Sequence, residues 1–442
     1  MDTALALAQH VDALSANALS STTREVAVRC VLDQLCAAAA GFDHGSAVAA
    51  RAAVPSLFGA GQADIWFAGT TTSPAGALLA NSVAGSAQDL DDGYRKARGH
   101  PGAAVIPAAW AMLAQSDAEV GAEDFLLAIV AGYEAGIRVA LGRLAYTPSG
   151  AWSPYAVIGA AGKLCGASPE VMAQAFRIAS QTAPALPGLA GLLGGDVKEG
   201  IGWGCVTGLA ALQLARAGFT GPAGIFDAPH LFAAGPMLDG RDGPPLIEGT
   251  YFKPFGCCRH LHGPLDAYLE LVERHALDYR QIDAIEVYTY RATFNLSPKP
   301  RPRNTIEAQY SVPYCLALCA AQGPDALVPI QPASLDDDTV LALAERITVH
   351  HDPELEPLFP ERSPAWVRVQ LADGNSFTSP ITDPRGDPRR PLSWDALQSK
   401  FIMATRHALP LRLQGRVLKA VDYLRQGDLA PLRAALRQSA GQ

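Results

Sequence analysis

The residues best suited to acid–base chemistry gather in one short segment between two apolar stretches. Residues 88–102 contain three aspartates, the first of them Asp89, together with Arg95 and His100. Carboxylates and imidazoles are among the groups that most often move protons in enzymes. His100 directly precedes Pro101, a residue tolerated at a helix start, and the positive end of a helix favours the neutral imidazole that a general base needs. The segment predicts a catalytic site or, in a structural interpretation, a capped helix end closed by a loop histidine.

A second cluster stands at residues 253–264, which contain Lys253, Arg259, His260 and His262 beside two adjacent cysteines. Adjacent cysteines cannot easily chelate one ion, and no Cys-x-x-Cys or His-x-x-x-His pair occurs elsewhere, so neither zinc nor an iron–sulfur cluster is expected. Arginine binds carboxylates through paired hydrogen bonds, and histidine can move a proton. The cluster therefore predicts recognition of a carboxylate at a junction between domains.

A third candidate is Lys198, in a glycine-rich stretch (residues 194–200) that leads into an apolar helix. A solvated lysine at a helix start is the structural alternative. The chain has no Gly-Lys-Ser/Thr phosphate loop, and no Gly-x-Gly-x-x-Gly follows a strand pattern. A nucleotide cofactor is therefore not expected.

A long helical region must position these groups. From residue 14 to residue 265 nearly every segment is rich in alanine, leucine and valine and long enough for a helix, with breaks at glycine and proline. Several of these segments are apolar on more than one face, which requires neighbours all round and indicates a thick bundle. The expected helices cover residues 23–40, 74–87, 101–114 and 123–141.

The pattern changes after residue 266. Residues 284–289, 347–350 and 367–371 are rich in β-branched side chains and alternate like strands. Asp-Gly at residues 373–374 predicts a tight turn to a returning strand. An antiparallel sheet is therefore expected in this part of the chain.

The predicted fold class is α+β, with a large all-helical domain and a smaller α+β lid domain. Helical patterns at residues 265–274 and 308–321 lie before and between the predicted strands. We expect residues 1–265, completed by residues 393–442, to form the helical domain, and residues 266–392 to form the lid.

Composition excludes several classes of protein. Of 442 residues, 49% are hydrophobic and 18% charged, which rules out a disordered chain. The formal net charge of −8 and the absence of a basic stripe argue against nucleic-acid partners. Eight scattered cysteines are too few for a disulfide scaffold, and no secretory signal or membrane-spanning pattern is found, so a soluble cytoplasmic protein with no membrane partner is expected.

Taken in order along the chain, these segments resemble the MmgE/PrpD family, which includes 2-methylcitrate dehydratase, cis-aconitate decarboxylase and iminodisuccinate epimerase. The resemblance spans most of the chain. It implies a helical domain completed by the carboxy-terminal helices, an α+β lid, a homodimer, and a site between the domains with no metal or organic cofactor. The motifs that carry it are Asp-Leu-Asp-Asp from Asp89, residues 100–108, Lys198, residues 253–254 with 257–259 and His262, and residues 307–314.

The resemblance also implies roles for single residues. The family's reactions develop negative charge next to a carboxylate, and cations must stabilise it. Lys198 and Arg259 would hold substrate carboxylates. His100, oriented by Asp89, would move the proton, and His262 would serve the leaving group or the opposite face. The substrate-binding set expected around these catalytic groups is Arg259, Tyr314, Tyr155 and Arg95.

Two departures from the family pattern concern the site. Gly93 stands where many relatives have threonine, and no histidine occurs between His100 and His230, although relatives carry one before the glycine-rich helix. This proton-transfer group of the family is either missing from the chain or replaced by Tyr155.

The resulting prediction is a cofactor-independent lyase that acts on a small di- or tricarboxylate. A 2-methylcitrate dehydratase-like hydro-lyase is the first choice, because elimination of water needs one base and one acid. Decarboxylation of the cis-aconitate type or epimerisation of the iminodisuccinate type would use the same groups. A helical binding protein without catalysis is the alternative from another class.

Overall fold

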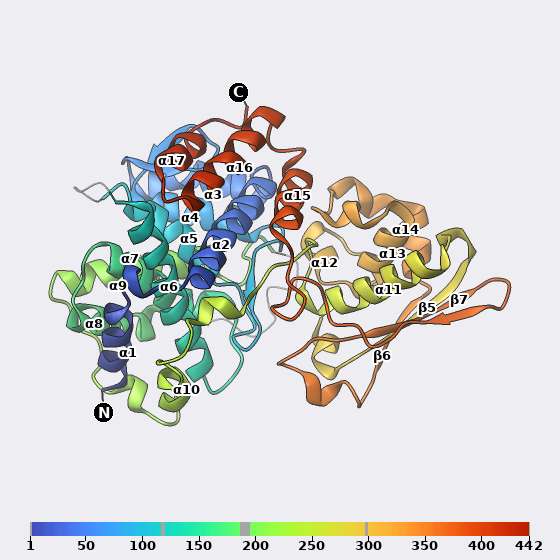
Figure 1. The fold of residues 1–442 in the computed structure, drawn as a ribbon, viewed down its shortest axis with the longest axis horizontal. Coiled ribbons are helices and arrows are strands. Elements are labelled where there is room, and N and C mark those ends of the chain that lie inside the picture. Colours follow the sequence, from blue (N-terminus) through green and yellow to red (C-terminus); the bar gives the residue numbers. More distant parts are fainter. Residues whose placement is uncertain (1, 116–119, 186–194, 297–298, 442) are drawn as a thin grey trace.

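The computed structural model describes residues 2–115, 120–185, 195–296 and 299–441. A large helical body lies beside a smaller unit of helices and strands (Figure 1). The fold class is α+β with a large helical domain, as predicted from the sequence. The helices of the body before residue 250 are α1 (Thr3–Ala13), α2 (Ser21–Ala40), α3 (Gly45–Phe58), α4 (Pro74–Ser86), α5 (Gly102–Met112), α6 (Ala122–Gly142), α7 (Ser153–Leu164), α8 (Pro169–Thr182), α9 (Ile201–Arg216) and α10 (Ala234–Leu238).

Small residues let the central helices of the body approach closely. A Cβ atom on Gly136 of α6 would lie 2.6 Å from the Cβ of Ala156 in α7, and one on Gly159 of α7 would lie 2.6 Å from the carbonyl oxygen of Ala131. Helix α6 is long and apolar enough to cross a bilayer, but 89% of its apolar window is buried inside the protein. Here it serves as a core helix, and every residue of α5 is buried beside it.

Two short antiparallel ladders interrupt the helical body, which the sequence pattern did not predict. Strand β1 (Ala63–Ile65) pairs with β2 (Thr70–Thr72), and β3 (Gly93–Tyr94) pairs with β4 (Thr250–Tyr251). The second ladder ties the aspartate-rich loop to the segment before Lys253. It also explains Gly93, because a Cβ there would lie 2.2 Å from the hydroxyl oxygen of Tyr251.

The smaller unit is a four-stranded sheet with helices packed against it. The strand order is β6 (Ile347–His351), β5 (Ile282–Thr289), β7 (Trp366–Leu371) and β8 (Ser376–Thr378). Strands β7 and β8 form the hairpin expected at Asp-Gly, with Gly374 at φ +89°. The sheet is mixed rather than antiparallel, because β5 and β6 run parallel. Parallel strands need a long crossover, here supplied by α12 (Thr305–Gln309), α13 (Val312–Gln322) and α14 (Asp338–Ala344).

The last helices return to the helical body. Helix α15 (Trp394–Thr405) packs on α2, α16 (Leu411–Arg425) packs beside it on the same helix, and α17 (Ala430–Leu436) packs on α16 (Figure 1). At the other end of the smaller unit, α11 (His262–His275) begins before the expected boundary at residues 265–266. That boundary therefore falls in the first turn of a helix.

Candidate active site

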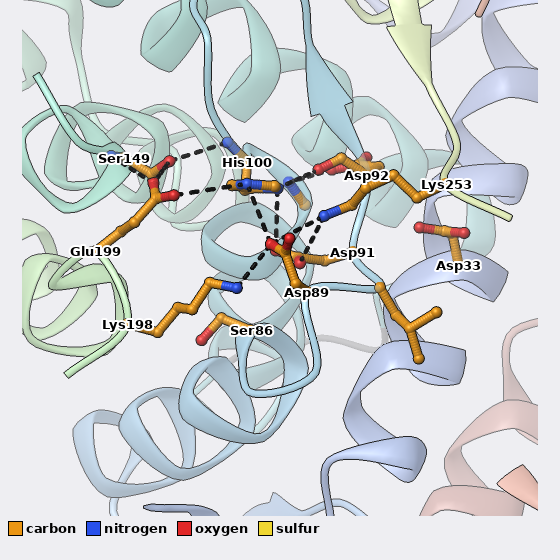
Figure 2. Close-up of polar contacts among 12 residues, drawn as sticks. Asp33, Ser86, Asp89, Asp91, Asp92, His100, Ser149, Lys198, Glu199 and Lys253 are labelled. Atoms are coloured by element: carbon orange, nitrogen blue, oxygen red, sulfur yellow. Dashed lines mark hydrogen bonds and ion pairs between the residues drawn. The ribbon is translucent and has the colours of Figure 1, made fainter. Parts of the chain in front are cut away.

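The aspartate-rich loop follows α4 and begins with a strained residue. Asp89 has φ +51°, in the left-handed region that side-chain-bearing residues rarely adopt. Such a conformation costs about 1–3 kcal/mol and persists only where the surroundings enforce it. Here the surroundings are two ammonium groups, since Asp89 Oδ1 lies 2.6 Å from Lys198 Nζ and 3.1 Å from Lys253 Nζ (Figure 2). The strained backbone thus directs the Asp89 carboxylate toward two lysines from distant segments of the chain.

This inner cluster is buried and fixed in charge. Asp89, with its side chain 1% exposed, would have its pKa raised by burial alone, but Lys198 and Lys253 outweigh that effect and hold the pKa well below its usual range. Lys253 is fully buried; burial opposes its charge, and Asp89 with Asp91 reverses the effect and raises its pKa. Both shifts favour the charged forms of Asp89 and Lys253, which makes this pair unsuited to proton transfer.

One ring nitrogen of His100 forms a hydrogen bond to the backbone, and the other faces the site with no hydrogen-bond partner among the described residues. Its Nδ1 lies 2.8 Å from the backbone carbonyl oxygen of Asp92. A carbonyl oxygen can only accept, so Nδ1 carries the hydrogen and Nε2 of the neutral ring has a free lone pair. Nε2 lies 3.7 Å from Asp89 Oδ1 and 3.8 Å from Glu199 Oε1. This tautomer presents Nε2 as a base or, once protonated, as an acid.

Asp89, Asp91 and His100 also form a group whose ligand atoms lie within 4.8 Å of one another, close enough to share a metal ion. The two lysines already neutralise the carboxylates of this group, since Lys198 and Lys253 both contact Asp89 and Lys253 lies 3.8 Å from Asp91 Oδ1. A divalent cation would have to share Asp89 with two ammonium groups. The donor set therefore suits lysine cations better than a metal ion.

A cavity of about 400 Å³ opens in front of these groups, between the helical body and the smaller unit. The body contributes His100 and Glu199, and the segments after β4 contribute Arg259 and His260. The remaining side of the cavity is aromatic. The lining residues are Arg95, Arg98, Gly99, His100, Tyr146, Pro148, Gly195, Val197, Glu199, Gly200, Tyr251, Cys258, Arg259, His260, Ala292, Asn295, Leu296, Tyr310 and Phe359.

The arginines of the cavity differ in how they are neutralised. Arg95 holds both carboxylate oxygens of Asp387, at 2.8 and 2.6 Å, and Arg259 lies 3.2 Å from the same carboxylate. Arg98 lines the cavity with φ +52° and lies over the Tyr146 ring at 5.1 Å. Among the described residues, no carboxylate pairs with Arg98. Arg98 is therefore the guanidinium that a substrate carboxylate can reach without displacing a protein carboxylate.

His262 is not placed as the sequence analysis expects. It is fully buried outside the cavity lining, with Nε2 donating to the carbonyl oxygen of Cys257 (3.1 Å) and Nδ1 facing Arg259 at 3.4 Å. Burial, then Arg259 and Lys253, hold its pKa well below the usual range. The structure thus places His262 outside the cavity lining and against Arg259, and its expected acid–base role stays a prediction.

The two expected tyrosines also lie outside the cavity. Tyr155 is buried in an aromatic cluster with Phe176 and Phe226, because α7 turns this face toward the core. Tyr314 is buried in α13, where its hydroxyl bonds Ser334 Oγ at 2.9 Å. The structure places neither tyrosine among the residues that line the cavity, so their expected roles stay predictions.

Several residues that line the cavity were given no role of their own in the sequence analysis, although His260 was named in its second cluster. Glu199 and Arg98 each stand one to three residues from a predicted residue, and His260 stands two residues from His262. Burial lowers the pKa of His260 to about 3, with Arg95 and Arg98 adding to the effect. Proximity to Lys198 was the available signal for Glu199. No sequence signal distinguishes His260 from His262, because helix α11 begins between them.

The fold is α+β, and a cavity lined by His100, Glu199 and Arg259 lies between the helical body and the smaller unit. The chain belongs to the MmgE/PrpD family: the MmgE/PrpD N-terminal domain matches residues 5–241 and the MmgE/PrpD C-terminal domain matches residues 255–426. It is a lyase of that family.

Curated relatives agree with this assignment. A cis-aconitate decarboxylase of Aspergillus terreus (strain NIH 2624 / FGSC A1156) is 29% identical over 72% of each chain. A second cis-aconitate decarboxylase of Aspergillus terreus is 28% identical over the same shares. A cis-aconitate decarboxylase-like protein of Aspergillus oryzae, oryM, is 27% identical over 74% of this chain and 75% of its own. The relatives found are named as decarboxylases and not as 2-methylcitrate dehydratases.

Proposed function

We propose that this protein is a decarboxylase of unsaturated tricarboxylates of the cis-aconitate type. One observation carries the proposal: His100 presents an open Nε2 to a cavity in which Arg98 has no carboxylate partner among the described residues. A substrate carboxylate can bind the arginine while a carbon atom of the substrate faces the imidazole. The names of the relatives support the same reaction class.

The chemistry needs one proton for each molecule of carbon dioxide. When the bond to the departing carboxylate breaks, its electron pair shifts the double bond and reaches a carbon beside a second carboxylate. That carbon must then be protonated, and cations nearby stabilise the charge while it develops. In the proposed reaction His100 Nε2–H supplies the proton. Asp89 and Glu199, each within 4 Å of Nε2, compensate the charge of the protonated ring.

Arg98 and Arg259 face different parts of the substrate in this proposal. Arg98 binds the outer substrate carboxylate, and Arg259, held by Asp387 and by His262, faces the inner end of the cavity. Lys198 lies behind the cavity wall, where it holds Asp89. In this proposal Lys198 acts on the substrate through the field of the buried cluster and not as a direct carboxylate ligand.

The test is a substrate screen with a matched catalytic control. The purified protein is incubated with cis-aconitate, 2-methylcitrate, citrate and iminodisuccinate, and products are followed by proton NMR together with carbon dioxide release. We expect carbon dioxide from cis-aconitate and none from the His100→Gln variant. Elimination of water from 2-methylcitrate without decarboxylation of cis-aconitate would instead establish the dehydratase, and no turnover of any of the four would contradict the proposed reaction.

We also propose a homodimer without metal or organic cofactor, located in the cytoplasm. Exposed apolar side chains of α3 and α9 lie side by side: Leu57 and Trp203 are more than half exposed, and the rings of Phe58 and Trp203 are 6.4 Å apart. Light scattering should give twice the chain mass of 46.4 kDa, and Trp203→Glu should reduce it to that mass. Retained activity after treatment with a strong chelator supports the metal-free proposal, and cell fractionation tests the location.

A further inference from the structure

Glu199 is held rigidly at the edge of the cavity. Its Oε2 accepts hydrogen bonds from Ser149 N (3.1 Å) and Ser149 Oγ (2.6 Å), and its backbone carbonyl accepts from Gly150 N (2.9 Å). Gly150 has no room for a side chain, since a Cβ there would lie 2.4 Å from the Glu199 carbonyl oxygen. The two loops are therefore fastened together by both side chain and backbone.

The backbone at Glu199 and Gly200 is strained, and this conformation positions the Glu199 carboxylate. Glu199 has φ +48° and Gly200 has φ +67°, two successive left-handed residues directly before α9. Strain at a residue other than glycine is maintained only where the surroundings enforce it, and such residues cluster at functional sites. Here the result is that one carboxylate oxygen, Oε1, is left facing His100 Nε2 at 3.8 Å (Figure 2).

Of the two carboxylates near His100 Nε2, one can carry a proton to and from solvent. Asp89 is 1% exposed and bound by Lys198 and Lys253, which hold its pKa well below the usual range. Glu199 lines the cavity, is 16% exposed, and has no ammonium or guanidinium partner among the described residues. The titratable groups that face it are His100, Tyr146 and Tyr310, with Lys198 next in the chain.

We propose that Glu199 is the proton relay that reloads His100 between turnovers. This inference rests on the proposed function. In each decarboxylation His100 loses its Nε2 proton to carbon, and carbon dioxide leaves with no proton. The Glu199 carboxylic acid then transfers its proton to Nε2, directly or through one water across the 3.8 Å gap, and takes another from solvent through the cavity. One proton is consumed for each carbon dioxide released.

The experiment separates the first turnover from the following ones. Glu199→Gln keeps an oxygen for the Ser149 hydrogen bonds but cannot carry a proton. With enzyme in excess over cis-aconitate, the single-turnover rate should match that of the wild-type protein, because the relay acts only after His100 has given up its proton. With substrate in excess, kcat should fall on the order of 10²-fold. Added formate should restore part of kcat in Glu199→Ala, and the dependence of kcat on pH should change in both variants.

The matched control is Asp196→Asn, which removes an exposed carboxylate from the same loop outside the cavity lining and should leave both rates unchanged. Unchanged kcat in Glu199→Gln, or equal loss of the single-turnover rate and kcat, would overturn the relay. Failure of the proposed function is distinct, because wild-type protein would then release no carbon dioxide from cis-aconitate. The relay would then have no net proton to supply, because elimination of water and epimerisation consume none.

Discussion

His100 and His262 look equivalent in the sequence but occupy opposite situations in the structure. His100 has one nitrogen bonded to the Asp92 carbonyl and the other open to the cavity. His262 is fully buried, with one nitrogen on the Cys257 carbonyl and the other on Arg259. The difference shows that the capacity to move a proton depends on which hydrogen-bonding positions the fold leaves open, and residue type alone does not decide it.

The largest expected effect is loss of proton transfer at His100. His100→Gln keeps a side chain of similar reach but removes the basic nitrogen, so kcat should fall by about 10²–10⁴-fold, the usual contribution of a general acid or base. Steady-state kinetics on the substrate identified by the screen measures this, with thermal unfolding as the control for folding. A variant that keeps near-normal kcat, with chemistry shown to limit the rate, would remove His100 from the mechanism.

The next largest effect concerns the buried charges beneath His100. Asp89→Asn leaves the ammonium groups of Lys198 and Lys253 close together without the carboxylate between them. Removal of one partner from a buried ion pair costs about 3–5 kcal/mol, so the free energy of unfolding should fall by that amount in denaturant titrations. Glu361→Gln, which breaks an exposed pair with Lys96, is the control and should cost under about 1 kcal/mol. Equal losses in the two variants would contradict this account of the cluster.

His262 should affect stability and its pH dependence more than chemistry. His262→Phe leaves the Cys257 carbonyl without a partner and should cost about 1–3 kcal/mol. The folded protein keeps His262 neutral, whereas the unfolded chain binds a proton below its ordinary pKa of 6.5. Stability therefore falls as pH drops below 6.5, by about 1.4 kcal/mol per pH unit for one such group.

His260, whose pKa is about 3, changes stability with pH in the same direction. The free energy of unfolding of the His262→Phe variant should therefore depend less steeply on pH than that of the wild-type protein, but the dependence should not vanish. Urea titrations between pH 5 and 7.5 compare the variant with the wild-type protein. A slope identical to that of the wild type would show that His262 is protonated in the folded state.

The smallest effect is expected at Tyr155. Tyr155 is not among the residues that line the cavity, and its ring packs against Phe176 and Phe226. Tyr155→Phe should leave kcat and KM unchanged and alter stability by under about 1 kcal/mol. A marked loss of kcat would mean that α7 moves toward the cavity during the reaction.

The overall class of fold could be predicted because it depends on local patterns. Alanine-rich segments with glycine and proline at their ends predicted helices such as α4, which begins at Pro74, and Asp-Gly predicted the β7–β8 hairpin. The parallel pairing of β5 with β6 could not be predicted, since residues 290–346 separate the two strands and neither pattern specifies its neighbour. The β3–β4 ladder is too short to leave an alternating pattern at all.

The site could be predicted in part for the same reason. The sequence located the residues that meet at the cavity, His100, Arg259 and Arg95, and the cluster of Asp89 with Lys198 behind it. It did not show which way each side chain faces. Tyr155, Tyr314 and His262 fall on buried faces of α7, α13 and α11, and a shift of a few residues in a helix start decides between core and cavity.

Lys400 anchors the aspartate-rich loop of the helical body. Its ammonium group in α15 donates to Asp33 Oδ1 at 2.6 Å and to the carbonyl oxygen of Leu90 at 2.7 Å, so it holds the loop that carries Asp89. A chain truncated before α15 would lack this anchor, although it would keep every residue that lines the cavity.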